Sequence, residues 1–114
     1  MKINARSKGR AYEQWIVNFI KAIGYTGERN SYVNKKADDI DKIDIASDFP
    51  FSIQAKAVER LSPSPHTILK EMGGSKPKCL WWKKNNQGTV VCMDLDTFID
   101  LITWTKKNPL KNYY

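Results

Sequence analysis

Residues 41–58 read DKIDIASDFPFSIQAKAV, and this stretch decides how the rest of the chain is interpreted. Two strand-like runs, Asp41–Ala46 and Phe51–Val58, are separated by Ser47–Pro50, whose residue types favour a turn. The pattern therefore predicts a β-hairpin. Side chains of a strand alternate between its faces, so Gln54 and Lys56 share a polar face while the residues between them point to the core.

Asp44 lies between two isoleucines on the first of these runs, so it also alternates against an apolar face. If both apolar faces enter the core, Asp44 stands opposite Gln54 or a residue two positions away, which requires a loop of odd length. We expect Asp44, Gln54 and Lys56 to converge. Asp41 is the competing acid, but it begins the run beside two other aspartates, where a solvated carboxylate is expected.

The residues upstream predict a helix. Apolar side chains recur at helical spacing from Ser7 to Ile23, and Gly24 follows where a left-handed cap is expected. Glu13 lies at the edge of the apolar face, from which it can look toward the hairpin. We expect a short strand over Glu28–Val33 and a loop over Asn34–Asp39.

The residues downstream predict a helix, two strands and a last helix. Ser64 before Pro65 is a typical helix start, and the pair Lys78–Lys83 and Thr89–Asp94 reads as two strands with apolar groups on both faces, which predicts that both are covered. Asp94 or Asp96 caps the final helix. One face of that helix carries Leu95, Phe98, Ile99 and Ile102.

This order predicts an α/β fold, a small mixed sheet flanked by helices. The 114 residues fit one domain, 1–114, in which we expect residues 105–114 to form a mobile basic and aromatic tail. No apolar run has the length of a membrane span and the N-terminus lacks a signal peptide, so we expect a soluble, cytoplasmic protein without membrane partners. Cys79 and Cys92 belong to no CxxC motif or Cys/His cluster that would bind a metal, so we expect them to be structural thiols.

The charge composition limits the classes of function to be considered. Nineteen Lys and Arg against twelve Asp and Glu leave a net charge of +7, which is typical of proteins that bind a polyanion, above all nucleic acid. Basic residues near the first helix and the following loop are candidate phosphate contacts, against the simpler view that they are a solvated surface. They are Arg6, Lys8, Arg10, Arg29, Lys35 and Lys36.

It costs free energy to gather two carboxylates, an amide oxygen and an ammonium group at one place, unless a cation or an anionic ligand compensates their charges. Magnesium prefers oxygen ligands and accepts a substrate phosphate in its coordination sphere. With a lysine to orient the attacking water, these groups suit phosphodiester hydrolysis. We therefore expect Glu13, Asp44, Gln54 and Lys56 to form a nuclease site.

At these residues the chain resembles the PD-(D/E)XK nuclease superfamily, in which a helix glutamate, a strand aspartate and an (E/Q)-x-K strand surround magnesium. The segments Lys8–Arg10, Gly24–Tyr25 and Phe49–Lys56 are most similar to small Holliday junction resolvases of phage and archaeal type. The resemblance implies a restriction-endonuclease-like αβββαβ core and a homodimer that cuts four-way DNA junctions. It also implies Mg²⁺, with Mn²⁺ as a substitute, bound by Glu13, Asp44, Gln54 and the Ala55 carbonyl, and host cytoplasm as the compartment for a phage protein.

Gln54 departs from the commoner pattern, because glutamate is usual at that position and glutamine removes one negative charge. Two alternatives therefore stay open: a restriction-like or nicking nuclease for duplex DNA, and a DNA-binding module that kept the fold without catalysis. The remaining residues of interest have simpler explanations. His66 is expected to be exposed without a catalytic role, and of Trp81 and Trp82 one fills the core while the other lies in an interface or stacks on a base.

Overall fold

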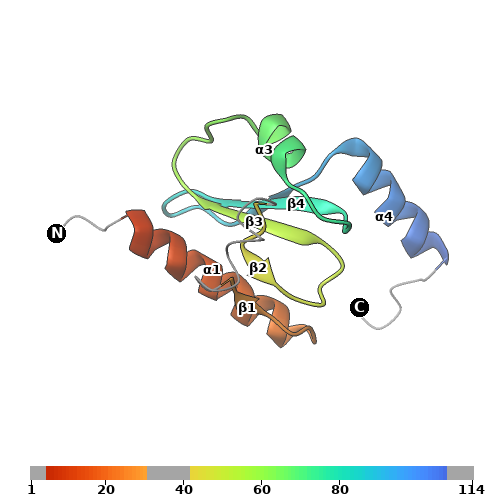
Figure 1. The fold of residues 1–114 in the computed structure, drawn as a ribbon, viewed down its shortest axis with the longest axis horizontal. Coiled ribbons are helices and arrows are strands. Elements are labelled where there is room, and N and C mark those ends of the chain that lie inside the picture. The colour runs from red at the N-terminus through yellow and green to blue at the C-terminus, as the bar shows by residue number, and fades with distance from the viewer. Residues whose placement is uncertain (1–4, 31–41, 108–114) are drawn as a thin grey trace.

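The computed structural model describes residues 5–30 and 42–107. A three-stranded sheet lies between helices α1 and α3, and α4 stands at one end of it (Figure 1). This arrangement confirms an α/β fold with a mixed sheet and flanking helices. The elements are α1 (Ala5–Ala22), β1 (Glu28–Arg29), β2 (Ile45–Ala46), β3 (Ser52–Ala57), α3 (Pro65–Glu71), β4 (Lys78–Lys83), β5 (Val90–Cys92) and α4 (Leu95–Lys107).

The main sheet has the order β3-β4-β5, with β3 parallel to β4 and β4 antiparallel to β5. β1 and β2 pair antiparallel in a separate two-stranded sheet. The predicted hairpin is therefore wrong: β2 pairs with β1, and β3 pairs with a strand that follows α3. Asp41 and the end of the run predicted over Glu28–Val33 lie outside the described residues, as does the predicted loop 34–39.

Side-chain contacts hold the 47–50 segment, which closes no hairpin ladder. The Asp48 carboxylate accepts hydrogen bonds from the Thr26 backbone N–H (2.8 Å) and hydroxyl (3.0 Å). Lys76 Nζ donates to the carbonyls of Ser47 (2.6 Å) and Phe49 (3.0 Å). These bonds tie the segment to distant parts of the chain. The two predicted runs still meet through one backbone bond, from the Asp44 N–H to the Ile53 carbonyl, but they form no strand ladder.

The predicted first helix is confirmed as α1, and Gly24 follows it with the expected left-handed backbone (φ 107°). Its buried side chains pack with Ile53, Cys79 and Trp81 of the sheet. Trp15 and Phe19, however, are 48% and 44% exposed. The sheet is too narrow to cover the whole apolar face of this helix. The buried residues of α1 are Tyr12, Ile16, Val17 and Ile20.

The predicted start of α3 is also confirmed: Ser64 is the N-cap and its Oγ accepts from the Thr67 N–H. β4 is covered on both faces as expected, with Leu80 and Trp81 buried. The same expectation is wrong for β5, where Val90 and Val91 are about half exposed because this strand is the sheet edge.

The last helix begins after Asp94, whose Oδ1 accepts from the Thr97 N–H at 2.8 Å, so Asp94 and not Asp96 is the cap. α4 continues to Lys107. Residues 105–107 are therefore helical, which corrects the start of the predicted tail, and the rest of that tail lies outside the described residues. No helix in the described ranges has both the length and the apolar character that a membrane span needs.

Candidate functional site

Strand β3 separates two sets of side chains as its sequence predicts. Ile53 is buried, and Ala55 and Ala57 pack with it against the core that α1 covers. By alternation, Gln54 and Lys56 lie on the opposite face, which is the side of α3. Their register partners on β4 are Leu80 and Trp82. The predicted separation of Gln54 and Lys56 from the core face is therefore confirmed, and the side chains of both residues are half-buried.

Asp44 is joined to β3 by two hydrogen bonds. Its backbone N–H donates to the Ile53 carbonyl at 3.0 Å, and its Oδ2 accepts from the Ala55 N–H at 2.8 Å. On the other side its carbonyl accepts from the Asn30 N–H at 3.1 Å. The carboxylate is thus fixed at the centre of the Gln54–Lys56 triplet. Asp44 therefore meets the backbone of the triplet. The predicted convergence of its carboxylate with the side chains of Gln54 and Lys56 stays a prediction.

Two side-chain amide oxygens are buried and have no hydrogen-bond partner among the described residues, and both belong to residues whose backbone adjoins Asp44 or its partners. They are Gln54 Oε1 and Asn30 Oδ1. Leaving a buried carbonyl oxygen unpaired costs about 1–3 kcal/mol of folding free energy. Each of these oxygens is therefore suited to accept a hydrogen bond from water or to coordinate a cation. The Asn30 amide nitrogen is held by the Ile43 carbonyl at 2.6 Å, which fixes the side chain. The sequence analysis did not identify Asn30, because no pattern in the residues around it predicts that its side chain is buried.

The donor set fits a hard divalent cation. Carboxylate and amide oxygens from Asp44 and Gln54 are ligands that magnesium accepts, with water completing its octahedron. Among the described residues no three His, Cys, Asp or Glu side chains gather at one point. A cation here would therefore depend on Gln54, on backbone carbonyls such as that of Ala55 and on water.

Glu13 is held by a partner that the sequence did not predict. Its Oε1 lies 3.9 Å from Nη1 of Arg29, and both side chains are partly buried. Arg29 is the last residue of β1, and Asn30 directly follows it, so this ion pair links α1 to the backbone that bonds to Asp44. The role of Glu13 as a metal ligand stays a prediction, and Arg29 is engaged inside the protein as well as being a candidate phosphate contact.

The other predicted phosphate contacts are spread out. Arg10 is exposed, and Arg6 lies in the first turn of α1. Lys35 and Lys36 lie outside the described residues. Lys8 lies 4.0 Å from a carboxylate oxygen of Glu59.

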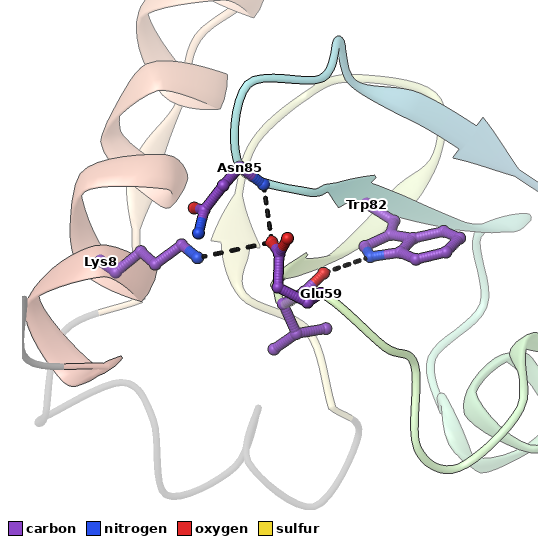
Figure 2. Close-up of polar contacts among 5 residues, drawn as sticks. Lys8, Glu59, Trp82 and Asn85 are labelled. Atoms are coloured by element: carbon purple, nitrogen blue, oxygen red, sulfur yellow. Dashed lines mark hydrogen bonds and ion pairs between the residues drawn. The ribbon is translucent and has the colours of Figure 1, made fainter.

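Glu59 connects three elements near the end of β3 (Figure 2). The Glu59 oxygen that approaches Lys8 also accepts from the Asn85 backbone N–H at 2.7 Å. Next to it, Trp82 Nε1 donates to the Val58 carbonyl at 2.7 Å. These contacts hold α1 and the β4–β5 turn together. Sequence reasoning missed Glu59 because its partners are distant along the chain.

Three further expectations have a structural outcome. Cys79 is buried, and burial raises the pKa of its thiol to about 12, as suits a structural residue. Cys92 is half-buried, and neither described cysteine is in a disulfide. His66 is exposed, as predicted. Trp81 is the tryptophan that fills the core, while Trp82 remains half-buried on the other face.

Comparison of the chain with protein-family models, with curated proteins and with solved structures found no match.

Proposed function

We propose that this protein is a magnesium-dependent, structure-specific endodeoxyribonuclease of the PD-(D/E)XK type that cuts branched DNA, with a Holliday junction as the expected substrate. The observation that carries the proposal is the bond from the Ala55 N–H to Asp44 Oδ2, at 2.8 Å. This bond holds the Asp44 carboxylate beside the Gln54–Lys56 strand. The side-chain oxygen of Gln54 in that strand is buried and has no partner among the described residues.

The element order supports the finer fold assignment. Among the described residues, one helix, three strands, a second helix and a strand parallel to the third occur in this order, which is the order expected of a restriction-endonuclease-like core. The net charge of +7 supports a polyanionic substrate.

In the proposed reaction, Asp44 and Gln54 would hold the cation, with the Ala55 carbonyl as a further ligand. Glu13 belongs to α1, which covers the other face of β3 and pairs Glu13 with Arg29, so its predicted role as a ligand has less support. When bound, Mg²⁺ polarises the phosphate and lowers the pKa of a coordinated water. Lys56 shares the face of Gln54, so its ammonium group orients the attacking water or stabilises the charge that develops on the phosphate. Ala55 N–H keeps the Asp44 carboxylate in place through the cycle.

The test is cleavage of a labelled four-way junction beside a linear duplex of the same sequence, with Mg²⁺, Mn²⁺ or EDTA. We expect paired symmetric nicks in the junction that need the metal and disappear in Lys56→Ala. Lys70→Ala, which removes an exposed lysine of α3, is the matched control and should cut normally. Cleavage of the duplex alone would indicate a restriction-like or nicking enzyme, and undiminished cleavage by Lys56→Ala would remove the site assignment.

A second candidate, a DNA-binding module without catalysis, is favoured by one observation. Glu13 already has a cationic partner in Arg29, and Gln54 carries no charge, so the site has fewer negative groups to attract a divalent ion than the usual pattern. Junction binding without cleavage in either metal would support this candidate.

We also propose that the protein is a homodimer and that α4 contributes to its interface. No side chain of α4 is buried. The four apolar residues of one face expose on the order of half of the roughly 800 Å² that one partner gives to a standard interface, and symmetric pairing is the common way to cover such a face. This face consists of Leu95, Phe98, Ile99 and Ile102, each at least 47% exposed.

Sedimentation equilibrium tests the dimer. Ile102→Glu places a charge on the apolar face and should convert the dimer to a monomer. Trp104→Glu is the matched control, because at about 100° per residue Trp104 lies on the opposite side of the helix. A monomeric wild-type protein, or an Ile102→Glu variant that stays dimeric, would contradict this interface.

A further inference from the structure

Two grooves flank the turn that joins β4 to β5. One has a volume of about 680 Å³ and lies between the start of α1 and this turn. The other, of about 630 Å³, lies beside Trp82. Because both are lined by Lys84, Gly88 and Thr89, they form one surface around the turn, which we call the turn grooves.

The turn grooves are basic. Lys8, Lys83 and Lys84 line them, and no carboxylate is among the described residues that do so. Glu59 lies alongside and holds Lys8 on one rim and Asn85 on the other (Figure 2). Glu59 therefore contacts both rims, and the lysines of the surface favour an anion.

Aromatic rings complete the surface. The bond from Trp82 Nε1 to the Val58 carbonyl fixes one indole, and Lys84 Nζ lies 5.4 Å from the centre of that ring. In the other groove Trp15 is 48% exposed, but its ring already stacks on those of Tyr12 and Phe19, with centroids 6.0 Å and 5.5 Å away, so Trp82 is the better stacking platform. Because Lys84 Nζ lies over one face of the Trp82 ring, a base would stack on the opposite face while its phosphate meets the lysine.

The position of Trp82 ties the turn grooves to the candidate site. Trp82 and Lys56 are register partners on neighbouring parallel strands, so their side chains share one face of the sheet. Neighbouring strands are about 4.8 Å apart. A nucleotide stacked on Trp82 would therefore bring its backbone next to Lys56.

We infer that the turn grooves bind an unpaired, single-stranded segment of DNA, with Trp82 stacking on a base and Lys83 and Lys84 contacting phosphates. Bases of an intact duplex are stacked on each other and cannot offer a free face to Trp82. The inference rests on the proposed nucleic-acid substrate but not on metal chemistry, and it identifies unpaired nucleotides at a branch point as the feature that is recognised.

The test is fluorescence anisotropy with a labelled oligothymidylate and a labelled duplex, in EDTA, over a series of salt concentrations. Because EDTA prevents cleavage, this binding is measured whether or not the protein is a nuclease. We expect tighter binding of the oligothymidylate than of a duplex of equal length. Trp82→Ala should weaken it about 5- to 100-fold, Trp82→Phe less, and Trp104→Ala, an exposed tryptophan of α4, hardly at all.

The double variant Lys83→Gln/Lys84→Gln should weaken binding and make the dependence of log affinity on log salt shallower by about 0.7 per lost phosphate contact. Lys106→Gln/Lys107→Gln changes the charge equally at the end of α4 and is the control. Equal effects of the two lysine pairs would show that only net charge matters and would overturn the inference. So would tighter binding of the duplex, or unchanged oligothymidylate binding by a Trp82→Ala protein with a native circular dichroism spectrum.

Discussion

Asp44 has a structural role and a proposed chemical role, and two substitutions separate them. Its Oδ2 accepts the Ala55 N–H at 2.8 Å, so Asp44→Ala removes a charge-assisted hydrogen bond and leaves that N–H without its acceptor. Such a loss costs about 2 kcal/mol. Asp44→Asn keeps an amide oxygen of the same shape in the same place, so the cost falls to about 1 kcal/mol or less.

For a domain of this size, about 1 kcal/mol lowers the melting temperature by roughly 4 °C. We therefore expect Asp44→Ala to melt about 8 °C below the wild type and Asp44→Asn no more than about 4 °C below it. Both should lose metal-dependent cleavage, because neither carries the charge that holds a cation. Thermal unfolding followed by circular dichroism, beside the junction assay, measures both effects. If Asp44→Asn is as unstable as Asp44→Ala, or if it cuts DNA normally, the two roles assigned to Asp44 are wrong.

Three other predictions follow from single residues. Gln54→Glu restores the charge of the commoner pattern and should lower the Mg²⁺ concentration needed for half-maximal cleavage, measured by a magnesium titration; an unchanged or higher requirement would argue against Gln54 as a ligand. Cys79, whose thiol pKa is raised to about 12 by burial, should resist alkylation at pH 8 in a Cys92→Ser background until the protein unfolds, and fast labelling of the native protein in a mass spectrum would contradict its burial. The Thr97 N–H holds the pKa of the Asp94 cap below its ordinary value of 3.8, so its stabilisation of α4 should be present above that pH and lost as the pH falls below it; helix content that falls equally in Asp94→Asn and wild type would refute this.

Local signals in the sequence were enough to predict most helices and their ends. Gly24 after α1, Ser64 before α3 and Asp94 before α4 each act through backbone hydrogen bonds or φ values within a few residues. Such signals do not depend on the rest of the chain, so they can be identified without the structure.

Strand pairing was less predictable, because it depends on distant residues. The 47–50 segment has turn chemistry, but β2 pairs with β1 and β3 with β4, and the segment itself bonds to the distant Thr26 and Lys76. The parallel pairing of β3 with β4 crosses α3 and leaves no local mark in the sequence. The wrong hairpin nevertheless gave the right polar face, because side-chain alternation within β3 does not depend on which strand is its neighbour.

The candidate site divides in the same way. Gln54, Lys56 and Asp44 were predictable from alternation and spacing. The buried Asn30 oxygen and the pairing of Glu13 with Arg29 were not, since both arise where β1 meets elements far away in the chain.

The central claim is that Asp44 and Gln54 hold a divalent cation, and direct titration of Mn²⁺ followed by electron paramagnetic resonance tests it without DNA. We expect the wild type to bind Mn²⁺ at a site that Mg²⁺ competes for and that Asp44→Asn abolishes, while Asp100→Asn, an exposed acid of α4, leaves it intact. Equal Mn²⁺ binding by wild type and Asp44→Asn, or none by the wild type, would contradict the account.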